Sequence, residues 1–168
     1  LAGSGYLTTP TVTISSPFSG TSGTPAVANI VGETASSGGN INTKYISRRV
    51  TLEDGFDASD LKVIVNAYKP LGSGLHVYFK VKSDEDPEDF DKKDYVLMSQ
   101  ETPSSVFSLT EGDTKELVFK SANDAITYTS SNVTYEKFKT FAIKIALTSN
   151  NATVIPKVRD MRAIALDE

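Results

Sequence analysis

The sequence predicts an all-β fold, an antiparallel β-sandwich of the jelly-roll kind with a short N-terminal β-hairpin arm. Apolar and polar side chains alternate in several short runs, and clusters of Gly, Pro, Asn and Asp separate these runs. No stretch has an apolar stripe long enough for a packed helix. Alternation on one face is typical of antiparallel sheets, because strands of parallel sheets are apolar on both faces.

Residues 1–40 differ in composition from the rest of the chain. They are rich in Gly, Ser, Thr and Pro, and Glu33 is their only charged residue. Two short β patterns, at 11–14 and 26–31, are separated by turn-forming residues, which predicts a hairpin with a long loop. We therefore predict an N-terminal β arm, or the end of a preceding repeat domain, over 1–40. The β-sandwich domain is predicted over 41–168.

The clearest strand patterns lie at 61–68 and 75–82, where apolar and polar positions alternate strictly. The segment between them, 70–74, contains two glycines, and this combination predicts an antiparallel β-hairpin. A third clear pattern is at 141–147, and the irregular pattern at 157–166 predicts a strand with a β-bulge. Weaker patterns predict further strands at 44–52, 95–100, 115–120 and 125–129.

The densest acidic run of the chain is 84–94, which contains seven Asp and Glu residues. Clustered carboxylates are the ligands that Ca²⁺ prefers, but the spacing of an EF-hand loop is absent. Counted from Asp84, the sixth position is Asp89 where Gly is needed, and the twelfth is Tyr95 where Glu is needed. Two lysines also partly neutralise the run. We predict a solvated surface loop with a short helical turn, and a cation-binding loop is the alternative.

No combination of residues in the sequence predicts catalysis. The chain has no cysteine, and therefore no thiolate nucleophile, thiolate metal site or disulfide. His76, the only histidine, falls on the outward phase of its strand, and no partner for an acid/base pair is visible. The nucleophile-elbow and phosphate-loop motifs are absent. We expect a non-enzymatic protein without a cofactor or metal.

Three aromatic side chains lie on the outward phase of the two central strands: Tyr68, His76 and Tyr78. Aromatic rings on a solvent-facing sheet bury area at low entropic cost, in protein interfaces and in sugar-binding platforms. We predict that these residues form an interface or glycan-binding face. The alternative is that the rings pack against a neighbouring loop of the same domain.

Charge and hydrophobicity exclude two classes of partner. The net charge is −4 and the basic residues are dispersed, whereas non-specific nucleic-acid binding needs a basic face. No apolar run approaches the ~18 residues of a membrane span. We therefore predict neither nucleic-acid binding nor membrane insertion.

Several motifs resemble bacteriophage proteins. Residues 3–14, GSGYLTTPTVTI, are similar to a repeat of phage tail proteins and other surface proteins. Residues 44–98, from KYISRRVTLEDGFDAS to DKKDYVLM, resemble large virion structural proteins of contractile-tailed phages, especially those that infect marine cyanobacteria. Residues 156–166, PKVRDMRAIAL, resemble the C-terminal region of the same proteins. The closing Pro-x-x-x-Asp-x-Arg pattern also resembles discoidin-like, galactose-binding jelly rolls.

The resemblance to virion proteins implies a function in assembly. It implies a structural module of the tail, baseplate or tail fibre that contacts other phage virion proteins, as a homo-oligomer or in a multi-copy assembly. It brings no catalytic residues with it. The weaker resemblance to discoidin-like domains implies the alternative function, a carbohydrate-binding adhesin that recognises glycans of the host surface.

Overall fold

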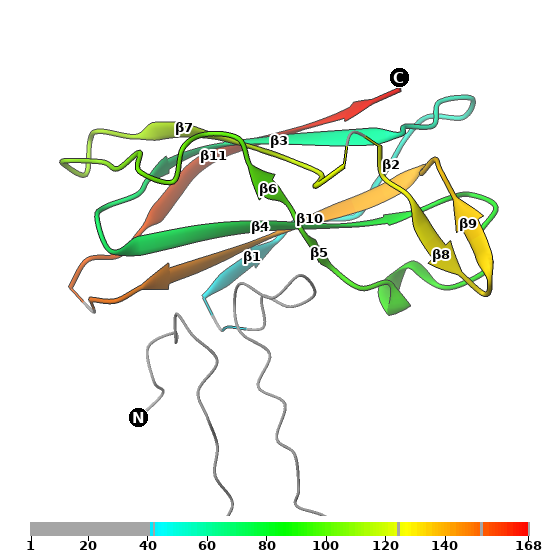
Figure 1. The fold of residues 1–168 in the computed structure, drawn as a ribbon, viewed down its shortest axis with the longest axis horizontal. Helices are drawn as coiled ribbons and strands as arrows, with labels where there is room; N and C mark the ends of the chain where they lie inside the picture. The colour runs from blue at the N-terminus through cyan, green and yellow to red at the C-terminus, as the bar shows by residue number, and fades with distance from the viewer. Residues whose placement is uncertain (1–40, 42, 124, 152, 168) are drawn as a thin grey trace, which may run out of the picture.

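The computed structural model describes residues 41, 43–123, 125–151 and 153–167 (Figure 1). The predicted N-terminal arm, 1–40, lies outside these residues. Within the described part, the fold is all-β, as predicted, with two antiparallel sheets facing each other as a sandwich. The part of the chain that the structure covers forms no helix with the length and hydrophobicity of a membrane span.

The two sheets are built from strands that alternate between them along the chain. Sheet 1 has the order β1-β10-β4-β5, with β2 also paired to β10, and sheet 2 has the order β11-β3-β7-β6. Strands β8 and β9 form a separate hairpin. The elements are β1 (Lys44–Ile46), β2 (Val50–Thr51), β3 (Asp60–Tyr68), β4 (Ser73–Lys82), the 3₁₀ helix η1 (Phe90–Lys92), β5 (Val96–Leu97), β6 (Ser99–Gln100), β7 (Lys115–Lys120), β8 (Tyr128–Ser130), β9 (Val133–Tyr135), β10 (Thr140–Ser149) and β11 (Lys157–Leu166).

The hydrophobic core lies between the two sheets, and it consists of the side chains that the alternation predicts to face inward. Successive side chains of a strand point to opposite faces, so every second residue reaches the core. Complete burial of one large aliphatic or aromatic side chain contributes about 1.5–3 kcal/mol. The core residues of the central strands are Leu61, Val63, Val65 and Ala67 on β3, Leu75, Val77, Phe79 and Val81 on β4, Leu117 and Phe119 on β7, and Phe141, Ile143 and Ile145 on β10.

The predicted hairpin of β3 and β4 is wrong. β3 pairs with β11 and β7, whereas β4 pairs with β10 and β5, so the two strands lie in opposite sheets. The turn between them contains Gly72 at φ +82°, a left-handed conformation that favours glycine. The pattern of apolar and polar residues cannot distinguish a hairpin within one sheet from two strands in opposite sheets. Apolar residues recur at every second position in both cases.

Two of the predicted strands carry irregularities that shape the sandwich. The predicted bulge in β11 is confirmed by a shift of register between Val158 and Asp160. The predicted strand at 95–100 divides at Met98: β5 pairs with β4 in sheet 1, and β6 pairs with β7 in sheet 2. The chain therefore crosses between the sheets at Met98 and closes one side of the sandwich. On the other side, β1, β2 and β11 form the edges of the two sheets.

Truncating a core residue near the start of β3 is expected to destabilise the fold strongly. Leu61 is fully buried, so Leu61→Ala should lower the free energy of unfolding by about 2–5 kcal/mol, through lost burial and a residual cavity. Leu109 is 90 % exposed, and Leu109→Ala should change stability by less than about 0.5 kcal/mol. Urea unfolding followed by circular dichroism measures both. Equal losses for the two variants would contradict this assignment of the core.

Candidate functional site

The structure does not bring the predicted aromatic face together. Tyr68 lies on β3 in sheet 2, whereas His76 and Tyr78 lie on β4 in sheet 1. All three follow the outward phase of their strands, so Tyr68 is on the opposite side of the sandwich from the other two. The wrong hairpin is the reason, because outward positions share a face only when their strands share a sheet.

Tyr78 is completely buried on the outer face of sheet 1, near a cluster of lysines and aromatic rings. The Nζ atom of Lys144 lies 5.0 Å from the centre of the Tyr78 ring and 4.1 Å from that of Tyr95. The Nζ atom of Lys80 lies 4.5 Å from the centre of the Phe90 ring. Burial, and then the charges of neighbouring lysines, lower the pKa of Lys144. Cation–π contacts thus hold the loop that follows β4 against this face.

The acidic run 84–94 is anchored by a buried ion pair. Asp86 has no exposed side-chain surface, and one of its carboxylate oxygens lies 2.5 Å from Nζ of Lys93. Lys93 also contacts Glu88 at 2.6 Å and donates a hydrogen bond to Ser130 Oγ at 2.8 Å. The hydroxyl groups of Tyr128 and Ser130 donate to Asp86 at 2.9 and 3.1 Å. These contacts fix the loop to the β8–β9 hairpin.

The charges of this network are mutually stabilised. Burial alone would raise the pKa of Asp86, but the hydrogen bonds from Lys93, the backbone of Glu88, Tyr128 and Ser130 outweigh it and hold the pKa at about 2. Burial opposes the charge of Lys93, yet its two carboxylate partners raise its pKa above the ordinary value. Both groups therefore remain charged at neutral pH.

The prediction of a solvated loop is wrong for Asp86, although most other carboxylates of the run are exposed. Lys93 supplies the positive charge that a bound cation would otherwise provide to Asp86. No group of three His, Asp or Glu in the described part of the chain is arranged to hold a metal ion. The two lysines at the end of the run were the sequence signal for this ion pair, but their partner could not be identified from spacing alone.

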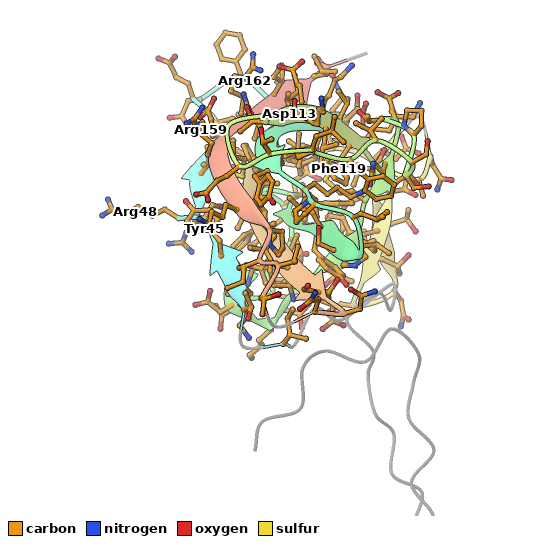
Figure 2. All side chains as sticks on the ribbon, turned by 90° about the vertical axis from the view of Figure 1, so that its left-hand side faces the viewer. Tyr45, Arg48, Asp113, Phe119, Arg159 and Arg162 are labelled. Atoms are coloured by element: carbon orange, nitrogen blue, oxygen red, sulfur yellow. The ribbon has the colours of Figure 1, made fainter. Side chains whose placement is uncertain are left out.

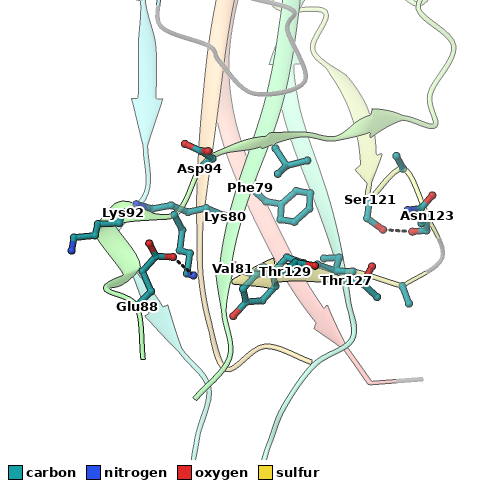
Figure 3. Close-up of a pocket in the computed structure, with 16 residues that line it drawn as sticks. Phe79, Lys80, Val81, Glu88, Lys92, Asp94, Ser121, Asn123, Thr127 and Thr129 are labelled. Atoms are coloured by element: carbon teal, nitrogen blue, oxygen red, sulfur yellow. Dashed lines mark hydrogen bonds and ion pairs between the residues drawn. The ribbon is translucent and has the colours of Figure 1, made fainter. Parts of the chain in front are cut away.

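A cleft of about 380 Å³ opens beside the last residues of β4 (Figure 3). It lies between β4, segment 88–96 and segment 121–129, and its volume falls in the ordinary range of binding pockets. Its lining contains both apolar and polar groups. Apolar lining comes from Phe79, Val81, Val96, Ala122, Ala125, Ile126 and the Tyr128 ring, and polar lining from Lys80, Glu88, Lys92, Lys93, Asp94, Ser121, Asn123, Thr127 and Thr129.

The aromatic groups of the cleft are already engaged by other residues. Tyr128 stacks on Tyr135 with 5.2 Å between ring centres, and Lys93 Nζ lies 5.2 Å from the centre of the Tyr128 ring. Burial raises the pKa of Tyr128 to about 12, and its hydrogen bond to Asp86 acts in the same direction. Phe79 belongs to the core and is 5 % exposed. Neither ring offers an open face for stacking on a sugar.

A second candidate surface is the side of the sandwich where β1, β2 and β11 form the edges, which we call the open side (Figure 2). Tyr45 lies opposite Ile145, and Val50 lies opposite Phe141, so both point toward the core side of sheet 1. Because they sit on edge strands, Tyr45 is 54 % and Val50 41 % exposed. The open side thus presents apolar side chains to solvent.

The β11 edge of the open side changes character along its length. Its first six residues contain the bulge and the charged residues Arg159, Asp160 and Arg162, which protect an edge against strand pairing. Its last four residues, Ala163 to Leu166, which we call the uncharged half, have no charge, and Ile164 is 42 % exposed. Within the described part of the chain no strand covers this uncharged half. Sequence patterning missed this edge because the order in which strands pair cannot be read from a single strand.

Removing the Asp86 charge is expected to destabilise the fold in a pH-dependent way. At pH 6, Asp86→Asn removes the buried partner of Lys93, which keeps the more exposed Glu88, and should cost about 1–3 kcal/mol. In the unfolded chain Asp86 titrates near its ordinary pKa of 3.8, against about 2 in the folded chain. Protons therefore bind the unfolded wild type first as pH falls below about 4. The stability gap between wild type and variant should narrow from pH 5 to pH 2.

Urea unfolding at pH 6, 4 and 2.5 measures this gap. Asp94→Asn is the matched control, because Asp94 is an exposed residue of the same loop. The control should differ from wild type by less than about 0.5 kcal/mol. A gap for Asp86→Asn that stays constant down to pH 2.5 would show that the carboxylate is not held ionised by the fold.

A functional assignment of this chain rests on its own residues and surfaces, because comparison with known proteins gives no relative to argue from. The resemblance to phage virion proteins stays a prediction from sequence motifs. The chain matches no family model, and neither curated proteins nor solved structures include a significant match.

Proposed function

We propose that this chain is a non-enzymatic structural module of a phage virion, in the tail, baseplate or tail fibre, and that it makes protein–protein contacts through the open side. The observation that carries the proposal is the exposed, apolar edge formed by β1, β2 and β11, which pairs with no further strand among the described residues. The motifs that resemble virion structural proteins are the reason for proposing a phage virion as the assembly.

An unprotected strand edge is a liability for a protein that stays alone in solution. Its free backbone N–H and C=O groups pair readily with another strand, and monomeric proteins therefore charge, shorten, twist or cover such edges. β11 is ten residues long and carries these protections only in its first six residues. The apolar residues Tyr45 and Val50, together with Ile164 on the outer face of sheet 2 next to this edge, add to the cost of leaving this side in water. A protein partner would both pair with the free backbone groups and cover the exposed apolar side chains.

The carbohydrate-binding alternative requires a different surface. It predicts at least two open aromatic faces beside polar groups, because sugar rings stack on such faces. Among the described residues, the cleft contains polar groups, but Phe79 is buried and Tyr128 is engaged by Tyr135 and Lys93. The proposal therefore assigns this domain to assembly rather than to glycan recognition.

A charge placed on the uncharged half of β11 is expected to disrupt assembly. The 168-residue chain should self-associate or bind phage tail particles assembled without it. Ile164→Lys should weaken that association by about tenfold or more, because it loses an apolar contact and buries a charge. Ile155→Lys is the matched control, since Ile155 is 56 % exposed and precedes β11.

Sedimentation velocity measures self-association, and cosedimentation with tail particles measures binding. Circular dichroism establishes that both variants are folded. A wild-type chain that stays monomeric and binds no tail particle would contradict the proposal. Equal effects of the two lysine substitutions would also contradict it, because they would show that β11 is not the contact.

A further inference from the structure

The edge of β4 that faces β5 is only partly occupied. β5 pairs with Tyr78 and Phe79, and the next backbone contact in this direction is from Met98 N–H to Val77 O at 2.8 Å. In an antiparallel ladder, alternate residues direct both backbone groups to the same neighbour. Val77, Phe79 and Val81 therefore face the β5 side. Among the described residues, no strand lies beside Val81 on that side.

The unoccupied position beside Val81 has defined ends. At one end, Val96 of β5 pairs with Phe79. At the other end, the N–H group of Ser83 donates a hydrogen bond of 2.7 Å to the hydroxyl of Tyr128. The distance from Phe79 to Ser83 along an extended strand is roughly 13 Å, which leaves room for a short extended segment. The cleft beside β4 occupies this position, and Val81 is part of its lining.

The lysines that line the cleft each have a carboxylate partner within the chain, and Lys92 lies 3.9 Å from Asp89. Lys93 is paired with Asp86 and Glu88, and Lys80 lies 4.0 Å from Asp91. A charged ligand group would have to compete with these existing pairs, and an uncharged one would not. The exposed apolar lining from Ala125 and Val96 favours contact with small apolar side chains. The cleft is thus complementary to an uncharged, extended chain.

We propose that the cleft binds an extended, uncharged segment of a partner polypeptide, which adds to sheet 1 as a short strand beside β4. The backbone of the segment hydrogen-bonds to the N–H and C=O groups of Val81, and an apolar or β-branched side chain contacts Ala125 and Val96. Strand addition of this kind takes its affinity from main-chain hydrogen bonds and its specificity from pockets for alternate side chains. The cleft and the open side are separate surfaces, so each proposal can fail without the other.

Hydrogen exchange in the free 168-residue chain tests the first requirement, an unpaired backbone at Val81. Lys82 O accepts a hydrogen bond from Lys139, which places Lys82, and by alternation Lys80, on the β10 side. The Val81 amide should therefore exchange with solvent at least about tenfold faster than the amides of Lys80 and Lys82. NMR of the ¹⁵N-labelled chain measures all three. Equal protection of the three amides would overturn the proposal, because the edge at Val81 would already be paired.

Selection from a display library of random twelve-residue peptides tests binding. Enriched peptides are expected to be poor in charged residues and to slow exchange of the Val81 amide. Thr127→Arg should weaken their binding about tenfold or more, because Thr127 is exposed and lines the cleft. Thr110→Arg, at an exposed position outside the cleft lining, should leave binding unchanged.

Three outcomes would overturn the proposed strand addition. The first is that no peptide is enriched over an unrelated control protein. The second is that enriched peptides bind without a change at the Val81 amide, which would place them elsewhere. The third is that both arginine variants bind as wild type does. None of these outcomes bears on the association through β11.

Discussion

The structure depends on the burial of inward side chains from β3 and β4 against each other across the space between the two sheets. These strands are consecutive in the chain, yet each is a central strand of a different sheet. Their packing therefore determines which faces of the two sheets meet. The turn at Gly72 and the crossing at Met98 carry the chain between the sheets. All other features, including the closed side, the open side and the cleft, follow from this arrangement.

The sequence predicted the positions of the strands better than it predicted which strands pair with each other. Period-two alternation located β3, β4 and β10, and the irregular pattern of β11 predicted its bulge, because side-chain periodicity reports local conformation directly. Pairing could not be predicted in the same way. An inward residue of β3 is apolar whether β4 lies beside it or across the core, and this ambiguity produced the wrong hairpin.

The lack of information on tertiary packing also explains what the sequence missed at the candidate sites. Tyr68 and Tyr78 were expected on one face because their strands were expected in one sheet. Asp86 was expected in water because its run is acidic, but Lys93, Tyr128 and Ser130 surround it. Two of these partners are distant in sequence and come together only when the β8–β9 hairpin packs on the loop after β4. Contacts of this kind are set by tertiary packing rather than by local pattern.

The two proposed contact surfaces have a common physical origin. A sandwich of two sheets has four strand edges, and each edge has backbone groups that must meet another strand, a loop or water. Here the crossing at Met98 joins β5 to β6 on one side, but no strand of the described part of the chain pairs with β4 at Val81 on that side. On the other side, β1, β2 and β11 stay unpaired along their outer edges within the described chain. Partner binding at these edges would complete the hydrogen bonding of the sheets.

An electron cryo-microscopy map of an assembled particle that contains this chain would show directly whether the open side is the contact surface. We expect a neighbouring protein chain to cover β1, β2 and β11, in an interface that buries about 1,200 Å² or more in total. A particle in which this side of the sandwich faces solvent, while the domain is attached through another surface, would contradict it.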